Sequence, residues 1–190
     1  MTDPDGAPRS AVSLRLPVEG DRGEFVRRLV ASAALHDPWL EPMDPDAWFD
    51  RLLERNGRET DRSLLVVRDE DRALVGVYNL SQIYRGPFCN AYLGYYAFAP
   101  FAGHGYMRVG LEQLIRYAFG ELGLHRLQAN IQPENLASIA LVRGAGFRKE
   151  GLARSYLSIR GAWRDHEQWA LVADDDAALA ILGGDDTPPA

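Results

Sequence analysis

The pattern of hydrophobic and polar positions changes its period several times between residues 12 and 172, and each change predicts a new element. Alternation of apolar and polar residues, or a short aliphatic run, predicts a strand, whereas apolar residues recurring every three or four positions predict a helix. The strands predicted in this way cover 12–16, 64–67, 73–80, 91–99, 125–131, 152–159 and 163–172. The predicted helices run from Phe25 to about His36, from Asp46 onward, over 106–122 and over 135–145.

This order, β-α-α-β-β-β-α-β-α-β-β, predicts an α/β fold in which helices cover the faces of one mixed sheet. Turn residues support the order, because the charged residues 69–72 and the pair Arg160 and Gly161 each divide two strands, as in hairpins. Gly144 or Gly146 closes the last long helix. Gly94, inside a strand, predicts a bulge or a close approach of backbone.

The chain has 190 residues, which is enough for one domain with a real core. We expect the domain to span 11–173, between a disordered tail at 1–10 and a flexible tail at 174–190 that holds one helical turn.

Composition narrows the class of protein. A hydrophobic content of 46% with 25% charged residues is ordinary for a soluble globular domain, and no apolar run approaches the ~20 residues of a membrane helix. The acidic start of the chain does not resemble a signal peptide, and the single cysteine, Cys89, fits a reducing compartment. We therefore expect a cytoplasmic protein. The net charge of -6 argues against nucleic-acid binding by bulk charge, and the four histidines lack metal-ligand spacing, so neither nucleic acid nor a metal is expected.

The most informative candidate site is the turn that contains Gly103 and Gly105, between an aromatic strand and a helix. Glycine permits a positive φ and a close approach to a ligand, and the first N–H groups of a helix bind anions. Such a turn can hold a pyrophosphate. Glycines also simply end strands and open helices, so the turn alone leaves both interpretations open.

Several motifs in a fixed order resemble those of the GNAT superfamily of acyl-CoA-dependent N-acetyltransferases. These are the glycine turn and its helix, the segment 124–130, Asn135 with Ser138, and the segment Gly146 to Gly151. The branch that the chain resembles is the RimJ/RimL type of protein N-terminal acetyltransferases. The residues that carry this finer resemblance are Arg85, Gly86, Tyr92, Gly94, Tyr95, Tyr156, Trp163, Arg164, Asp165 and His166.

The resemblance implies where acetyl-CoA binds. Main-chain N–H groups of Ala102, Gly103, His104, Gly105, Tyr106 and Met107 would hold the pyrophosphate. The pantetheine arm would lie along Tyr96, Ala97 and Phe98, with Asn135 and Ser138 beside the cofactor. Two departures matter: the family usually has Gln or Arg in place of Ala102, and many relatives carry a carboxylate in place of Tyr92.

Acetyl transfer needs a neutral amine, a polarised carbonyl and a protonated leaving thiol. An α-amine has a pKa of about 7.7–8.0 against about 10.4 for lysine, so an enzyme for N-termini can work without a strong base. A backbone N–H near Ala97 or Phe98 would polarise the carbonyl. Ser138 is the candidate acid, although a serine in the first turn of a helix often only caps it. Asn135 can be both the N-cap and a cofactor contact.

Tyr92, a candidate catalytic residue, and Tyr95, a candidate substrate contact, are expected on one face of the sheet; both can equally be packing residues. Arg164 and His166 share a strand face and either orient the acceptor or stabilise a hairpin. Arg85, in the loop before the strand at 91–99, is a candidate for gripping a carboxylate or the backbone of the substrate. His104 is expected to be exposed.

We expect an N-acetyltransferase for the N-terminal α-amine of a protein, of the ribosomal-protein type, acting by direct attack. The alternatives are an enzyme for a small amine, such as an antibiotic, polyamine or amino acid, and a non-catalytic acyl-CoA-binding module. A homodimer is compatible with the resemblance.

Overall fold

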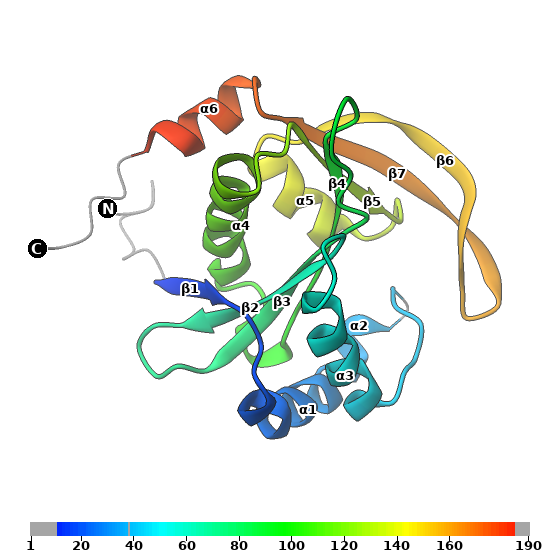
Figure 1. Ribbon diagram of the computed structural model, residues 1–190. Helices are drawn as coiled ribbons and strands as arrows, with labels where there is room; N and C mark the ends of the chain where they lie inside the picture. Colours follow the sequence, from blue (N-terminus) through cyan, green and yellow to red (C-terminus); the bar gives the residue numbers. More distant parts are fainter. Residues whose placement is uncertain (1–10, 38, 185–190) are drawn as a thin grey trace, which may run out of the picture.

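A seven-stranded mixed sheet forms the centre of the molecule in the computed structural model, which describes residues 11–37 and 39–184 (Figure 1). The strand order is β1-β2-β3-β4-β5-β7-β6, and all neighbours are antiparallel except β4 and β5, which are parallel. The strands are β1 (Val12–Arg15), β2 (Arg62–Arg68), β3 (Leu74–Ser81), β4 (Asn90–Ala97), β5 (Arg126–Ile131), β6 (Arg148–Ile159) and β7 (Ala162–Val172).

Helices cover both faces of this sheet (Figure 1). Tyr78 of β3 lies against Gly110 of α4, and its partner on β4 is Tyr95. Tyr96, one residue further, points to the other face, where its ring meets Phe25 of α1 edge to face, so α4 and α1 lie on opposite faces. The helices are α1 (Arg22–Ala31), α2 (Ala33–His36), α3 (Pro45–Asn56), α4 (Tyr106–Arg116), α5 (Leu136–Gly144) and α6 (Asp176–Gly183), with short helical turns η1 (Glu19–Asp21), η2 (Ala99–Phe101) and η3 (Tyr117–Glu121).

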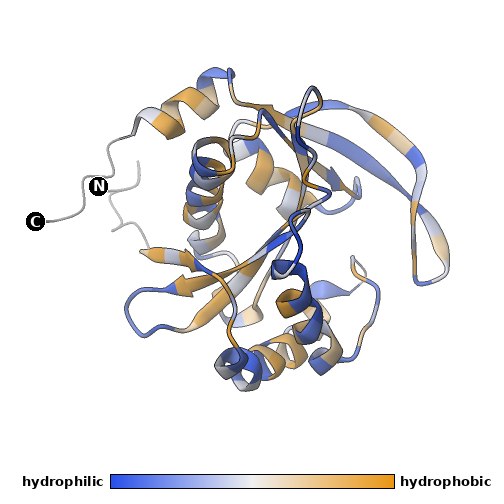
Figure 2. Ribbon diagram, in the orientation of Figure 1, coloured by the Kyte–Doolittle hydropathy of each residue, from blue (hydrophilic) through white to orange (hydrophobic). Residues whose placement is uncertain are grey.

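The core follows from the hydrophobic pattern (Figure 2). Phe25 of α1, Phe49 of α3 and Phe98 are fully buried together. The ring centroids of Phe49 and Phe98 lie 5.2 and 5.8 Å from that of Phe25. On the other face, Leu111 and Leu114 of α4 are fully buried. Strands β2 and β3 lie between these two layers, and residues on alternate sides of each strand meet different helices. Both faces are therefore buried, which is why these strands are mainly apolar.

One break in the sheet positions the site. The parallel strands β4 and β5 pair only at Asn90–Arg126, Ala91–Leu127 and Tyr92–Gln128. Beyond Tyr92 no further pair joins these two described strands. The backbone N–H and C=O groups that face each other there are therefore not bonded between β4 and β5. The opening leads from β4 through η2 to the start of α4.

The predicted α/β fold is confirmed, with local differences. Asp44, not Asp46, caps α3, because its Oδ1 accepts from the Ala47 N–H at 2.9 Å. Gly94 makes no bulge, because β4 pairs with β3 in unbroken register. Register shifts lie instead in β2, at Val66 and Val67, and in β6, at 149–151 and 153–157. Gly146, with φ +91°, follows the end of α5 as expected.

The C-terminal segment is more ordered than a tail with a single turn. Helix α6 has eight residues, its Ala178 is fully buried, and Arg116 of α4 donates to the carbonyl of Ile181 at 2.9 Å. The residues for which a disordered N-terminal tail was expected, 1–10, and the end of the chain, 185–190, lie outside the described residues.

Candidate active site

A cavity of about 480 Å³ occupies the opening between β4 and β5. Its walls come from the end of β4, the glycine turn and first residues of α4, the first turns of α5, the end of β5, and α2 with the residues after it. The lining residues predicted from the sequence are Tyr95, Tyr96, Ala97, Ala102, Gly103, Gly105, Met107, Asn135, Ser138 and His166. The structure therefore brings together ten candidate residues from four separate segments.

The glycine turn has the predicted conformation. Gly103 has φ +78° and Gly105 has φ +81°, and a Cβ added to either would meet no atom within 4 Å. Gly105 is the N-cap of α4, and its carbonyl accepts from the N–H groups of Arg108 and Val109. The N–H groups of the first helical residues have no partner within a helix, so those at Tyr106 and Met107 are free for an anion.

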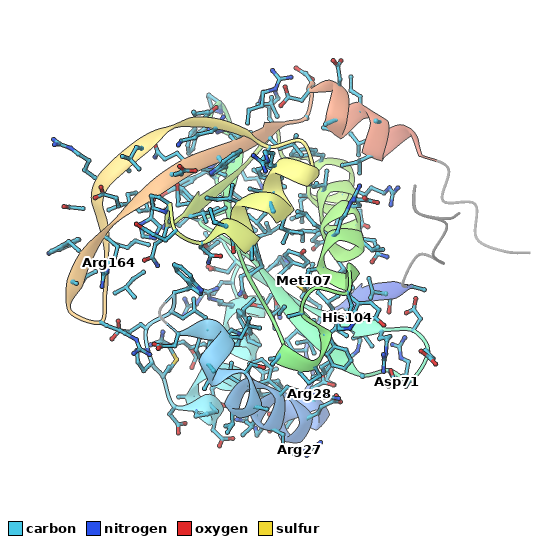
Figure 3. All side chains as sticks on the ribbon, turned by 180° about the vertical axis from the view of Figure 1, so that it is seen from behind. Arg27, Arg28, Asp71, His104, Met107 and Arg164 are labelled. Carbon is cyan, nitrogen blue, oxygen red and sulfur yellow. The ribbon has the colours of Figure 1, made fainter. Side chains whose placement is uncertain are left out.

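The start of α4 is fastened to β3. The hydroxyl of Tyr78 donates to the carbonyl of Met107, and a Cβ on Gly76 would lie 2.5 Å from the sulfur of Met107. Only glycine at position 76 therefore lets Met107 pack this closely against the strand. Figure 3 shows Met107 and His104 together at this end of α4.

Arginines from distant parts of the sequence surround the turn. The guanidinium carbons of Arg28 and Arg68 lie 4.8 and 5.0 Å from the centre of the Phe101 ring, and Arg108 lines the cavity itself. Figure 3 shows Arg28 on α1 and, near the β2–β3 turn, Asp71, which accepts from Arg68 at 2.9 and 2.6 Å. This ion pair lowers the pKa of Asp71 to about 2. Arg28 and Arg108 also face carboxylates, Glu24 at 3.2 Å and Glu112 at 3.8 Å, so the three arginines are paired and add little net charge at the turn.

The open edge of β4 presents backbone groups to the cavity. The N–H of Phe98 donates to Val75 of β3 at 2.9 Å, so Phe98 cannot polarise a ligand carbonyl, and that part of the prediction is wrong. Because N–H groups alternate sides along an antiparallel strand, those of Tyr95 and Ala97 point into the opening. His36 Nε2 lies 2.8 Å from the carbonyl oxygen of Ala97, and burial lowers the pKa of this histidine.

The first turn of α5 forms another wall. Asn135 is its N-cap, and its Oδ1 accepts from the N–H of Ser138 at 3.1 Å. The hydroxyl of Tyr95 donates to the carbonyl of Ser138 at 3.1 Å, which ties α5 to β4 across the opening. Burial raises the pKa of Tyr95.

The wall opposite α2 is polar. His166 of β7 is only 3% exposed, its Nδ1 lies 3.1 Å from the carbonyl oxygen of Arg164, and its ring centre lies 5.4 Å from that of Tyr156. Asn130 donates to the hydroxyl of Tyr156 at 3.1 Å and accepts from Gln128 at 3.1 Å. Asn130 also lines the cavity; it ends the segment 124–130 that carries the family resemblance, but it was not predicted as a site residue.

Six predicted site residues do not line the cavity: Arg85, Tyr92, Phe98, His104, Tyr106 and Arg164. Arg85 donates to the carbonyl of Leu122, and Arg164 is exposed on the β6–β7 hairpin (Figure 3). His104 is exposed as expected, and it stacks on Tyr106.

Tyr92 and Tyr95 lie on opposite faces, which corrects the expectation that they share one. Three positions along an unbroken strand reverse the side-chain direction. Tyr95 accordingly reaches α5, whereas Tyr92 stands at the last β4–β5 pair, where its charge would influence Arg126 and Tyr156.

The cavity is free of carboxylates: none of its described lining residues is Asp or Glu, and Arg108 is the one arginine or lysine among them. Within residues 11–37 and 39–184, no group of three or more His, Cys, Asp or Glu residues could hold a metal ion. The helices of the same described ranges are all too short or too polar to cross a membrane.

Comparison with known proteins shows the family. A model of the acetyltransferase (GNAT) domain matches residues 12–148. A probable N-acetyltransferase of Bacillus subtilis, YjcK, is 37% identical over 123 residues, which are 65% of this chain and 68% of that protein. The ribosomal protein uS5-alanine N-acetyltransferase of Escherichia coli is 41% identical over 106 residues, and the match spans 56% of this chain but only 55% of the relative.

Solved structures agree on the fold. RimJ of Mycobacterium smegmatis, in complex with CoA-disulfide, has a TM-score of 0.81 at 26% identity, covering 92% of this chain and 90% of that one. A spermidine N-acetyltransferase from Vibrio cholerae, in complex with CoA and spermine, has a TM-score of 0.72 at 21% identity, covering 85% and 95%. At that identity the second likeness shows the fold alone.

Proposed function

Because this chain belongs to the acetyltransferase (GNAT) family, we propose that it transfers the acetyl group of acetyl-CoA to the N-terminal α-amine of a protein. The observation that carries the choice of acceptor is the cavity without carboxylates among its described lining residues. The relatives named as alanine N-acetyltransferases of a ribosomal protein support the same choice.

The residues present fit acetyl-CoA. The N–H groups of Ala102 and His104 donate to the carbonyls of Ala99 and Phe101 at 3.4 Å, which corrects that part of the expected set. The diphosphate would enter the open space above Gly103 and Gly105 and accept from the N–H groups of these two glycines, Tyr106 and Met107. Arg108, which lines the cavity and lies 3.8 Å from Glu112, would take the place of the Gln or Arg that the family usually has at Ala102. The pantetheine arm would run along the backbone edge at Tyr95 and Ala97. The bound CoA-disulfide in the RimJ neighbour supports this assignment.

Each catalytic task has a residue of this chain in reach. A backbone N–H of β4, at Tyr95 or Ala97, would polarise the thioester carbonyl. Ser138, in the first turn of α5, would give a proton to the leaving thiolate and take one back from water. Tyr92 does not line the cavity, so we give it no part in the reaction.

The acceptor follows from charge. A polyamine or aminoglycoside keeps several positive charges when one amine is neutral, and burying such charges without partners is costly. A protein N-terminus carries one charge, lost in roughly a third of molecules near pH 7.5. The apolar side chains of Leu35, Trp39 and Leu40 would then contact the first side chain of the acceptor.

Release of free thiol from acetyl-CoA tests the proposal with a panel of acceptors. Peptides with N-terminal alanine should be used far better than spermidine or an aminoglycoside. The matched control is the same peptide with a blocked N-terminus and an internal lysine, which should give background rates. Preference for spermidine, or equal use of the blocked peptide, would contradict the proposed acceptor.

A further inference from the structure

We propose that His166 is the general base that accepts the proton of the attacking amine; this inference rests on the proposed function. His166 lies at the cavity wall and only 3% of it is exposed, so its imidazole is shielded from bulk solvent. The sequence pattern left two roles open for His166, orienting the acceptor or stabilising a hairpin.

The hydrogen bonding of His166 sets its tautomer. The Arg164 carbonyl can only accept, so Nδ1, at 3.1 Å from it, must carry the proton. In the neutral ring Nε2 is then an unprotonated acceptor. The Tyr156 ring packs against the imidazole with centres 5.4 Å apart and an interplanar angle of 55°, which fixes its orientation. A general base needs an unprotonated nitrogen that can accept a proton, and Nε2 of this neutral ring is such a nitrogen because Nδ1 donates to the backbone.

Burial favours the neutral ring of His166 more strongly than its neighbours favour the charged ring. Asp165 is the single carboxylate that raises its pKa electrostatically, and burial outweighs that effect and lowers the pKa. Arg164 faces it through its carbonyl, Tyr156 packs on it from β6, and His36 and Arg108 stand on other cavity walls. The ring is therefore ready to accept a proton at neutral pH.

The step balances as follows. The amine nitrogen forms a bond to the acetyl carbon while the bond from that carbon to sulfur breaks. His166 Nε2 takes the proton that the nitrogen loses, and the departing thiolate gains one from Ser138. His166 then releases its proton to water, and Ser138 recovers one from water. The products are an N-acetylated chain and free CoA thiol.

His36 is the rival, because it also lines the cavity and also has a lowered pKa. Its Nε2, however, bonds the carbonyl of Ala97 at 2.8 Å, and its ring contacts Tyr96 with centres 5.5 Å apart. These contacts fasten α2 to the end of β4, next to the proposed pantetheine arm. We assign His36 to positioning that arm. His166 instead stands beside the polar pair Asn130 and Tyr156, on the wall away from β4.

Kinetics of the 190-residue chain with an N-terminal alanine peptide test the proposal. His166→Ala should lower kcat about 10²–10⁴-fold, the range for loss of a general base. The acid limb of the pH–rate profile should disappear, and added imidazole should restore part of the rate. The Kd of CoA, measured by calorimetry, should stay within about twofold, so failure of His166 is distinguishable from failure of cofactor binding. His36→Gln should raise KM for acetyl-CoA and keep the acid limb. The exposed His125→Gln should change neither.

A spectroscopic measurement keeps the proposal testable even where His166→Ala does not fold. Nitrogen chemical shifts of the wild-type imidazole should show a neutral ring with the proton on Nδ1 at pH 7. A charged ring, or a proton on Nε2, would overturn the proposal. So would an unchanged kcat and acid limb in folded His166→Ala, or loss of the limb in His36→Gln instead.

Discussion

At Gly105 one backbone angle decides whether the helix N-terminus can hold a diphosphate. A φ of +81° costs a non-glycine residue about 1–2 kcal/mol, although its Cβ would meet nothing within 4 Å. Gly105→Ala should therefore weaken CoA binding about five- to tenfold, through conformation rather than a clash. Calorimetric titration with CoA measures this. The control is Gly120→Ala, which also meets no atom but has no positive φ, and equal Kd values for the two variants would contradict the argument.

Substitutions of Asn135 and Ser138 distinguish the stabilising effect of the helix cap from the proposed catalytic role of the serine hydroxyl. The cap is the bond from the Ser138 backbone N–H to the Asn135 side chain, so the serine hydroxyl takes no part in it. Asn135→Ala should cost about 1 kcal/mol of unfolding free energy, whereas Ser138→Ala should leave stability unchanged and lower kcat. Urea unfolding and thiol-release kinetics measure the two effects. A stable but fully active Ser138→Ala protein would remove Ser138 from the mechanism.

The sequence predicted those site residues that belong to local motifs. Gly103, Gly105, Asn135 and Ser138 each lie at a turn or helix start whose signals are a few residues long, and the structure places all four at the cavity. Arg28, Arg68 and Asn130 were missed because they reach the site from α1, β2 and β5 through tertiary packing. The prediction that the Phe98 N–H polarises the carbonyl was wrong, because the direction in which a strand N–H points depends on the pairing register.

At the scale of elements, the unexpected feature is α6, which packs where a tail was expected. Gly146 marks the contact: a Cβ there would lie 2.2 Å from that of Ala177, and its φ is +91°. Gly146→Ala should lower the unfolding free energy by about 2–4 kcal/mol, from overpacking and backbone strain together. Thermal unfolding measures the loss. Gly144→Ala, two residues away inside α5 and with open space around it, should instead be neutral or slightly stabilising.

Element types were predictable because most elements carry a clear period, and the hairpins carry charged or glycine turns. The separation of β4 from β5 was not predictable by periodicity, since both strands keep their hydrophobic pattern where pairing stops. The length of helix α6 was underestimated because Asp174, Asp175 and Asp176 are typical of a solvated tail. In the structure Asp175 accepts from the Val172 N–H at 2.9 Å and so stabilises the turn before the helix.

At the scale of the whole molecule, the sheet joins two halves through a short parallel contact. The half with β1–β4 carries the glycine turn, and the half with β5–β7 carries His166. The cavity therefore depends on both halves being folded, and it includes two histidines, His36 and His166, whose pKa values burial lowers. The protonation state of the cavity and the free energy of unfolding should consequently change over the same pH range.

The sign of that dependence follows from proton binding. Between the lowered pKa of the folded protein and the ordinary value of about 6.5, the unfolded chain binds more protons. The contribution of these histidines is thus fully present above about pH 6.5 and is lost as pH falls through their folded pKa. Urea unfolding at pH 7.5 and pH 5.5 measures it, above the range where carboxylates titrate. The wild type should lose more unfolding free energy over this interval than the His36→Gln and His166→Gln double variant. An equal loss in both proteins would show that neither histidine is held neutral by the fold, and would also deprive His166 of the property that suits it to accept a proton.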